Sequence, residues 1–151
     1  MRKLNIIQIA LGLSLSFAAI GQERLPSDEY EVYKADKERI EREYKADKER
    51  CESFDGNAED ICVAEAEGKQ KIAKAELEAK SKPSAETYYQ VQVARAKANY
   101  EVAKERCDDQ SGNAQDVCLK EAKAAEAAAI ADAKREDYES RNPNPALEGG
   151  F

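Results

Sequence analysis

The sequence contains no histidine and no tryptophan, and it has one methionine and three phenylalanines. Histidine is the side chain that most often acts as a general acid or base near neutral pH, so its absence removes the commonest catalytic group. Large apolar side chains are scarce, because 36% of the residues are charged and alanine supplies much of the apolar fraction. We therefore expect a thin hydrophobic core.

Other signatures of catalysis are missing as well. No glycine-rich phosphate loop or nucleophile motif occurs, and the serines, lysines and carboxylates are scattered along what read as solvated helix faces. We expect no catalytic, cofactor-binding or metal-binding residues, and therefore no enzyme. The Ala/Glu/Lys-rich composition is typical of long helices, which predicts an all-α fold.

The chain is acidic, with 31 aspartates and glutamates against 24 lysines and arginines and a formal net charge of −7. A field of this sign repels nucleic acid and anionic membrane surfaces, so neither is an expected partner.

The amino terminus has the form of a signal peptide. Met1 to Lys3 is basic, Leu4 to Ala19 is mostly apolar, and small residues precede a cleavage site predicted after Gly21. A retained membrane anchor is the alternative, but the apolar run is shorter than the roughly 20 residues that a spanning helix needs. No cysteine lies near the cleavage site to carry a lipid. The pattern predicts export and a mature chain without a membrane anchor.

An internal repeat dominates the rest of the sequence. The segment CESFDGNAEDIC, from Cys51 to Cys62, returns as CDDQSGNAQDVC, from Cys107 to Cys118. Both cysteines of the first segment are separated from their counterparts by the same distance in sequence, without a gap, which indicates two duplicated units. A shorter echo, YKADKER, begins at Tyr33 and again at Tyr44, a spacing that returns a helix to nearly the same face.

Each unit reads as helix, turn, helix. Within the shared motif Gly-Asn-Ala-x-Asp, the glycine suits the left-handed residue that ends a helix, and the asparagine suits the N-cap of the next. The aspartate falls where it can reach back to the cap and meet the positive end of the helix dipole. A calcium loop is disfavoured, because it needs more oxygen donors at short spacing. These turn and cap residues are Gly56, Asn57 and Asp60 in the first unit, and Gly112, Asn113 and Asp116 in the second.

The apolar spacing predicts four long helices with coiled-coil-like packing. Gly68 weakens the second helix by about 1 kcal/mol relative to alanine. Pro83 breaks the chain between the units, and Ser81 or Ser84 can cap the next helix. We expect hairpins at 28–81 and 84–138 and a disordered tail at 139–151. In the third helix the packing stripe is Tyr89, Val93, Ala96, Tyr100, Ala103 and Cys107, and in the fourth it is Cys118, Ala122, Ala125 and Ala129.

The four cysteines fit a disulfide framework. Facing Cα atoms of two helices packed about 10 Å apart come within disulfide range. This favours the pairs Cys51–Cys62 and Cys107–Cys118, each closing one hairpin. Pairings that join the two units stay open, because spacing alone does not exclude them. A zinc site and a redox-active pair are disfavoured, since both normally use closer spacings.

The two cysteine-bracketed segments resemble a class of small exported bacterial proteins with repeated Cys-bracketed Gly-Asn-Ala-x-Asp-Val-Cys motifs between Ala/Lys/Glu-rich helices. The similarity extends from about Tyr33 to Arg135. Some such sequences are labelled TolA-like, after the cell-envelope protein with a long Ala/Lys/Glu helix. The resemblance implies a periplasmic address.

Two function classes follow from these expectations. The first is a non-catalytic structural or interaction protein of the cell envelope that meets a protein partner or a second copy of itself. The second is a small periplasmic chaperone that holds unfolded clients. Suppression of aggregation of a denatured test protein distinguishes them.

Overall fold

The computed structural model describes residues 26–142, so the predicted signal peptide, its cleavage site after Gly21 and the end of the tail lie outside the described residues. Within this range the chain forms four helices. None of the four contains an apolar stretch of the length and hydropathy that a membrane span requires. Their bounds are α1 Pro26–Cys51, α2 Asn57–Ser81, α3 Ala85–Cys107 and α4 Asn113–Arg141.

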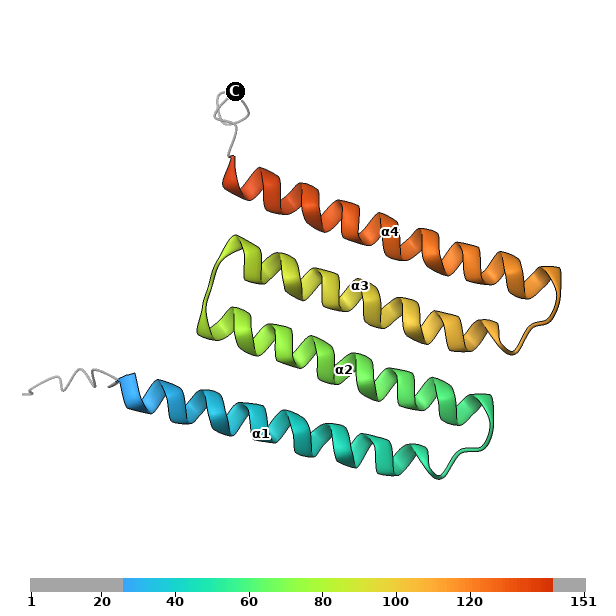
Figure 1. Ribbon diagram of the computed structural model, residues 1–151, viewed down its shortest axis with the longest axis horizontal. Coiled ribbons are helices and arrows are strands. Elements are labelled where there is room, and N and C mark those ends of the chain that lie inside the picture. The colour runs from blue at the N-terminus through green and yellow to red at the C-terminus, as the bar shows by residue number, and fades with distance from the viewer. Residues whose placement is uncertain (1–25, 143–151) are drawn as a thin grey trace, which may run out of the picture.

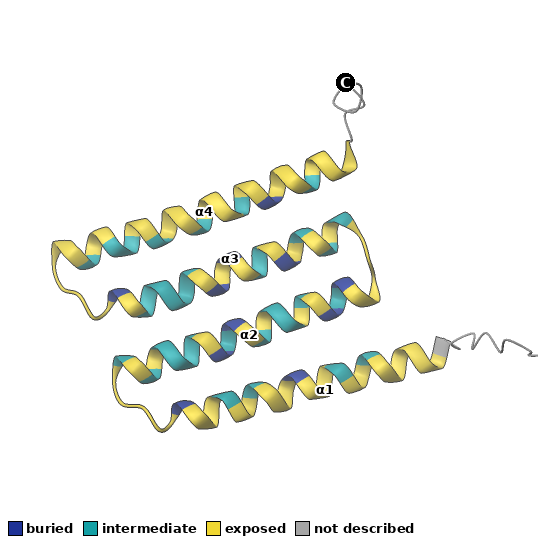
Figure 2. Ribbon diagram, turned by 180° about the vertical axis from the view of Figure 1, so that it is seen from behind, coloured by how far each residue is buried: buried dark blue, intermediate teal, exposed yellow. Residues whose placement is uncertain are grey.

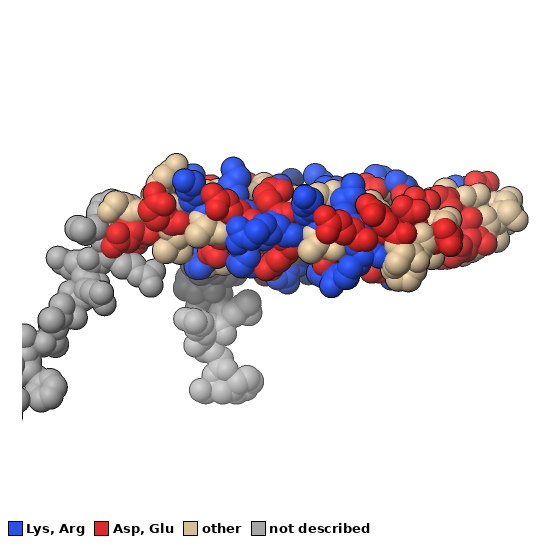
Figure 3. Space-filling view, turned by 90° about the horizontal axis from the view of Figure 1, so that it is seen from below, with Lys and Arg blue, Asp and Glu red and all other residues tan. Residues whose placement is uncertain are grey.

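The helices lie side by side in a single antiparallel layer (Figure 1). Each helix packs only on its neighbours in the chain, as α1 on α2, α2 on α3 and α3 on α4. The two turns that carry the repeated motif lie at one end of the layer, and the link between the units lies at the other. Seen edge-on, the molecule is a slab one helix deep (Figure 3). The all-α fold of two stapled hairpins is confirmed.

The break between the units has the expected chemistry. The Ser84 hydroxyl accepts a hydrogen bond from the Thr87 amide at 3.1 Å, and the Ser84 amide donates to the Thr87 hydroxyl at 3.0 Å. This reciprocal capping box begins α3 directly after Pro83. The fourth helix is longer than predicted, because it continues past residue 138 to Arg141. Arg141 is held there by Asp137, whose carboxylate lies 2.9 Å from the guanidinium.

The core is thin, as the composition predicts. Only Cys51 and Cys107, one half of each disulfide, are completely buried among residues 26–142. Most of α4 is exposed (Figure 2). The buried apolar residues are Ile40, Cys51, Ala66, Leu77, Ala79, Val91, Ala96, Ala98, Cys107 and Ala133.

The two inner helices are buried along two stripes instead of one. The predicted stripe of α3 faces α4, since Tyr100 lies under the Lys123 ammonium and Cys107 is bonded to Cys118. A second stripe, which includes Val91 and Ala98, lies on the side of α2. An inner helix of a layer has two neighbours, so it needs apolar residues on two opposite sides.

Gly68 marks a close approach between the hairpins. A Cβ added at Gly68 would lie 2.9 Å from the Cβ of Ala98 and 3.6 Å from its Cα. The glycine lowers the helix propensity of α2, but it also lets α2 and α3 pack backbone against backbone. The junction between the two units is therefore built from small side chains.

Candidate functional site

The two disulfides close the two hairpins at the same end of the layer. Cys51 is bonded to Cys62 and Cys107 to Cys118, with Cα–Cα distances of 5.5 Å and 5.7 Å. The predicted pairing within each unit is confirmed, and all four cysteines are disulfide bonded.

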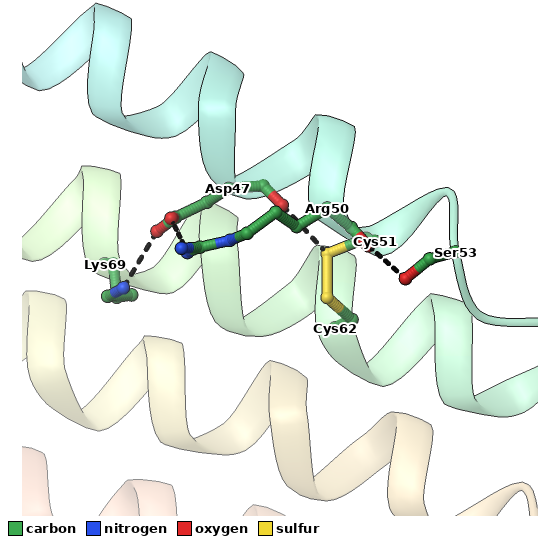
Figure 4. The surroundings of a disulfide bond; sticks show 6 residues. All are labelled: Asp47, Arg50, Cys51, Ser53, Cys62 and Lys69. Atoms are coloured by element: carbon green, nitrogen blue, oxygen red, sulfur yellow. Dashed lines mark hydrogen bonds and ion pairs between the residues drawn. A yellow bond between two sulfur atoms is a disulfide. The ribbon is translucent and has the colours of Figure 1, made fainter.

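Charged side chains lie on one side of the first staple (Figure 4). Asp47 forms ion pairs with Arg50 and with Lys69, whose Nζ lies 2.8 Å from the Asp47 carboxylate. The Sγ of Cys51 lies 3.3 Å from the Asp47 carbonyl oxygen. This is a contact between atoms, because a disulfide sulfur carries no proton to donate. Cys51 is completely buried and its partner Cys62 is half-buried, so a thiolate could reach this disulfide only from the Cys62 side.

The turns depend on glycine, but the sequence assigns the caps wrongly. Gly56 and Gly112 have the predicted positive φ, at 60° and 58°, but their ψ values of −140° and −136° are not those of a left-handed helical residue, and neither glycine ends a helix. Each glycine, however, is the N-cap of the following helix, and Asn57 and Asn113 are the first helical residues, without a side-chain cap hydrogen bond. The predicted asparagine caps are therefore wrong. Asp60 and Asp116 lie in the first turns of α2 and α4, where they meet the helix dipole.

Asn57 joins the two stapled turns to each other. Its side-chain amide donates to the carboxylate of Asp109, in the second turn, at 2.7 Å. The two residues belong to different units of the repeat. The turns are thus connected laterally as well as closed by their own disulfides.

Replacing Gly112 by alanine should destabilise the protein by about 1–3 kcal/mol, because φ near +60° with ψ near −140° strains any residue with a Cβ. Steric contact does not contribute, since nothing lies within 4 Å of the added Cβ. Urea unfolding followed by circular dichroism measures the loss. Asn113→Ala is the matched control and should change stability little, because the side chain makes no cap bond. Equal losses in both variants would contradict this assignment of the cap.

A regular set of ion pairs crosses α1, α2 and α3 on one face of the layer. Members of like charge on each helix share one spacing, which corresponds to about three helical turns and returns each side chain to nearly the same face. Each exposed pair contributes only about 0.2–1 kcal/mol, but together they favour one register of the three helices. The pairs are Asp36–Lys80 at 3.2 Å, Asp47–Lys69 at 2.8 Å, Glu76–Arg95 at 2.7 Å and Glu65–Arg106 at 2.9 Å.

Two carboxylates of this set have lowered pKa values. Hydrogen bonding to Lys80, with a further contribution from Arg39, lowers the pKa of Asp36. Hydrogen bonding to Lys69 lowers the pKa of Asp47 in the same way. A lowered folded-state pKa stabilises the fold above the ordinary carboxyl pKa of about 3.9 and ceases to do so as the pH falls through the folded value.

We therefore expect the midpoint of thermal unfolding to fall as the pH is lowered below about 4. Thermal melts at a series of pH values measure this dependence. The variant with Asp36→Asn and Asp47→Asn should lose part of the decrease, because the two groups then carry no titrating proton. An identical pH profile for the variant would show that these pairs do not stabilise the fold.

Grooves lie on both sides of the junction between α2 and α3, and both include Gly68 and Ala98. One is open and mainly apolar, with a volume of about 670 Å³ and Ile72, Val102 and Ala103 in its wall. The other is charged, with Lys71, Lys104, Glu101 and Glu105 among its lining residues. The Glu101 and Glu105 carboxylates each lie 3.0 Å from the Lys104 ammonium and raise the pKa of that lysine.

The predicted turn residues lie together at one end of the layer. The contact between α2 and α3, which joins the two hairpins, was not predicted from the sequence. Gly68, Ala98 and the cross-helix ion pairs have a signal in the sequence, namely the second small-residue stripe and the regular recurrence of like charges along each helix. Within residues 26–142, no group of three or more Cys, Asp or Glu side chains is placed to hold a metal ion.

Comparison of the chain with protein-family models, with curated proteins and with solved structures found no match in any of the three.

Proposed function

We propose that the protein is an exported, non-catalytic helical protein with a structural or protein-interaction role in the cell envelope. The observation that carries the proposal is the pair of disulfides in a layer one helix deep. Disulfides persist in oxidising compartments outside the cytoplasm. A layer without a second layer on top leaves both of its broad faces open to other molecules. Its α1 edge carries interspersed charges of both signs (Figure 3).

The leader-like amino terminus and the resemblance to small exported bacterial proteins support the periplasm as the compartment. Cell fractionation with intact-mass measurement tests this part of the proposal. The expected product begins at residue 22, lies in the soluble periplasmic fraction and is lighter than the reduced chain by four hydrogens. A full-length chain in the membrane fraction, or a reduced chain, would contradict export and oxidation respectively.

Crosslinking in intact cells followed by identification of the captured protein tests the interaction role. Substitutions on the exposed helix faces should reduce capture of the partner. Substitutions at buried positions that leave the fold intact should not reduce it. If no specific protein is captured and loss of the chain changes no property of the envelope, the interaction role is wrong.

A holdase function has one specific observation in its favour, which is the open apolar groove beside Ile72 and Val102. Such a groove can accept an extended apolar segment of an unfolded client. Wild-type protein at a stoichiometric ratio should then suppress aggregation of a denatured test protein. The variant with Ile72→Glu and Val102→Glu should lose the effect, whereas Lys97→Glu on α3 should keep it. No suppression by the wild type would remove this function.

A further inference from the structure

The repeat relates the outer edges of the layer to its central junction. When Cys51 is aligned with Cys107, α1 corresponds to α3 and α2 corresponds to α4. We call the side of α4 that faces away from α3, and the side of α1 that faces away from α2, the free edges of the layer. The free edge of α4 therefore corresponds to the side of α2 that packs on α3. The free edge of α1 corresponds to the side of α3 that packs on α2.

Two ion pairs hold the central junction together across its exposed face. The Arg106 guanidinium lies 2.9 Å from the Glu65 carboxylate, and the Arg95 guanidinium lies 2.7 Å from the Glu76 carboxylate. In each pair α2 supplies the acid and α3 supplies the arginine.

The same charges occupy the equivalent positions of the two free edges. Glu65 and Glu76 of α2 correspond to Glu121 and Asp132 of α4. Arg95 and Arg106 of α3 correspond to two arginines of α1, Arg39 and Arg50. Both arginines are well exposed, at 51% and 71% of their side-chain surface. Each also pairs with acids of α1 itself, Arg39 with Asp36 and Glu43 and Arg50 with Asp47, so a second copy shares them with these acids. One edge thus presents the acids of the junction and the other presents its arginines.

The same register also determines which residues lie between these charges. Gly68 faces Ala98 at the junction, so the same register applied to a second copy places Ala124 opposite Arg42 of the second copy. Ala124, Ala128 and Ala131 are exposed and small. Ala124 and Arg42 nevertheless carry a Cβ where the junction has Gly68 against Ala98, so the helices at this contact lie farther apart than α2 and α3, and the charges define the contact. The register also places two basic residues of α4 near two acids of α1, namely Lys120 near Glu49 and Arg135 opposite Glu31.

We propose that a second copy of this chain docks with the free edge of its α1 on the free edge of α4, in the register and with the ion pairs of the junction between α2 and α3 but without its close backbone approach. Glu121 and Asp132 pair with Arg50 and Arg39 of the second copy. The contact joins two different edges, so it leaves one of each kind free and extends head to tail. Association of separate copies depends on protein concentration. Because charged side chains form most of the contact, association should also weaken as salt is added.

This inference rests on the two edges and not on export, so its failure would leave the test of localisation unaffected. Sedimentation velocity of the purified, oxidised protein at rising concentration tests it. Wild-type protein should shift from monomer to dimer and longer species at low salt. The variant with Glu121→Arg and Asp132→Arg should associate about tenfold or more weakly, and so should the variant with Arg39→Glu and Arg50→Glu, because ion pairs become repulsions.

Mixing the two variants provides the decisive comparison. Each reversed edge then meets a complementary edge on the other variant, so the mixture should assemble although neither component does. The variant with Glu52→Arg and Asp55→Arg is a control for the variant with Glu121→Arg and Asp132→Arg, because it makes the same change in charge at exposed turn residues, and it should associate like wild type. A monomeric wild type at all concentrations would overturn the proposal. So would association that persists when Arg39 and Arg50 are reversed, which indicates a symmetric contact of α4 with α4, or a mixture that fails to assemble.

Discussion

Replacing Cys107 and Cys118 together by alanine should lower the midpoint of thermal unfolding by roughly 10 °C. The disulfide closes a short loop of the chain, and its loss returns about 2–4 kcal/mol of conformational freedom to the unfolded state. The effect is large because the core is thin, and Cys107 is itself completely buried. Thermal melts followed by circular dichroism measure the shift.

The helix content of the folded variant should stay close to that of the wild type. Helix propensity, the capping box at Ser84 and the glycine turns do not depend on the disulfide. Reduction of the wild-type protein should produce the same kind of shift, since it opens both staples. If melts of oxidised and reduced protein coincide, the structural role of the disulfides is wrong and a reactive role has to replace it.

Replacing Gly68 by leucine should separate the two hairpins and destabilise the protein by about 1–3 kcal/mol. Even the first added carbon would lie 2.9 Å from the Ala98 Cβ, and that neighbour is a rigid alanine which cannot turn away. Each hairpin keeps its disulfide, so the damage should concentrate at the contact between α2 and α3. Hydrogen exchange of residues 57–81 and 85–107, together with urea unfolding, measures it.

The internal repeat provides a matched control for this substitution. Ala124 is the counterpart of Gly68 in α4 and is exposed on the free edge, so Ala124→Leu should leave stability nearly unchanged in the monomer. A second comparison uses volume exchange, in which Ala98→Gly should recover the stability lost in Gly68→Ala. Failure of that recovery would show that packing at this point is not what joins the hairpins.

Much of the fold follows from local signals. Pro83 with Ser84, the positive-φ glycines and the cysteine spacing define the ends of four helices and close them into two hairpins. These signals act over a few residues, where backbone restriction and loop geometry decide the outcome. The pairing within each unit was predictable for the same reason.

The arrangement of the two hairpins relative to each other was harder to predict from the sequence. A heptad stripe on α3 is compatible with a closed bundle and with an open layer, and only the second stripe through Ala98 shows that α3 has neighbours on opposite sides. Gly68 has opposite effects at two levels, since it weakens the isolated helix and permits the close contact. The cap error has a similar origin, because asparagine is a common N-cap but Gly56 already occupies that position.

The open layer is the central structural claim, and the separation of α1 from α4 tests it most directly. Paramagnetic labels on unnatural side chains at Lys37 of α1 and Lys134 of α4 leave the disulfides intact, and both positions are exposed. Dilution with unlabelled protein removes distances between copies. With neighbouring helices about 8–10 Å apart, a layer predicts that the axes of α1 and α4 lie about 24–30 Å apart. Double electron–electron resonance should report a distance in this range, after allowance for the length of the label side chains. A distance that corresponds to helices in direct contact, about 10 Å between axes, would mean that the chain closes into a bundle and would contradict the layer.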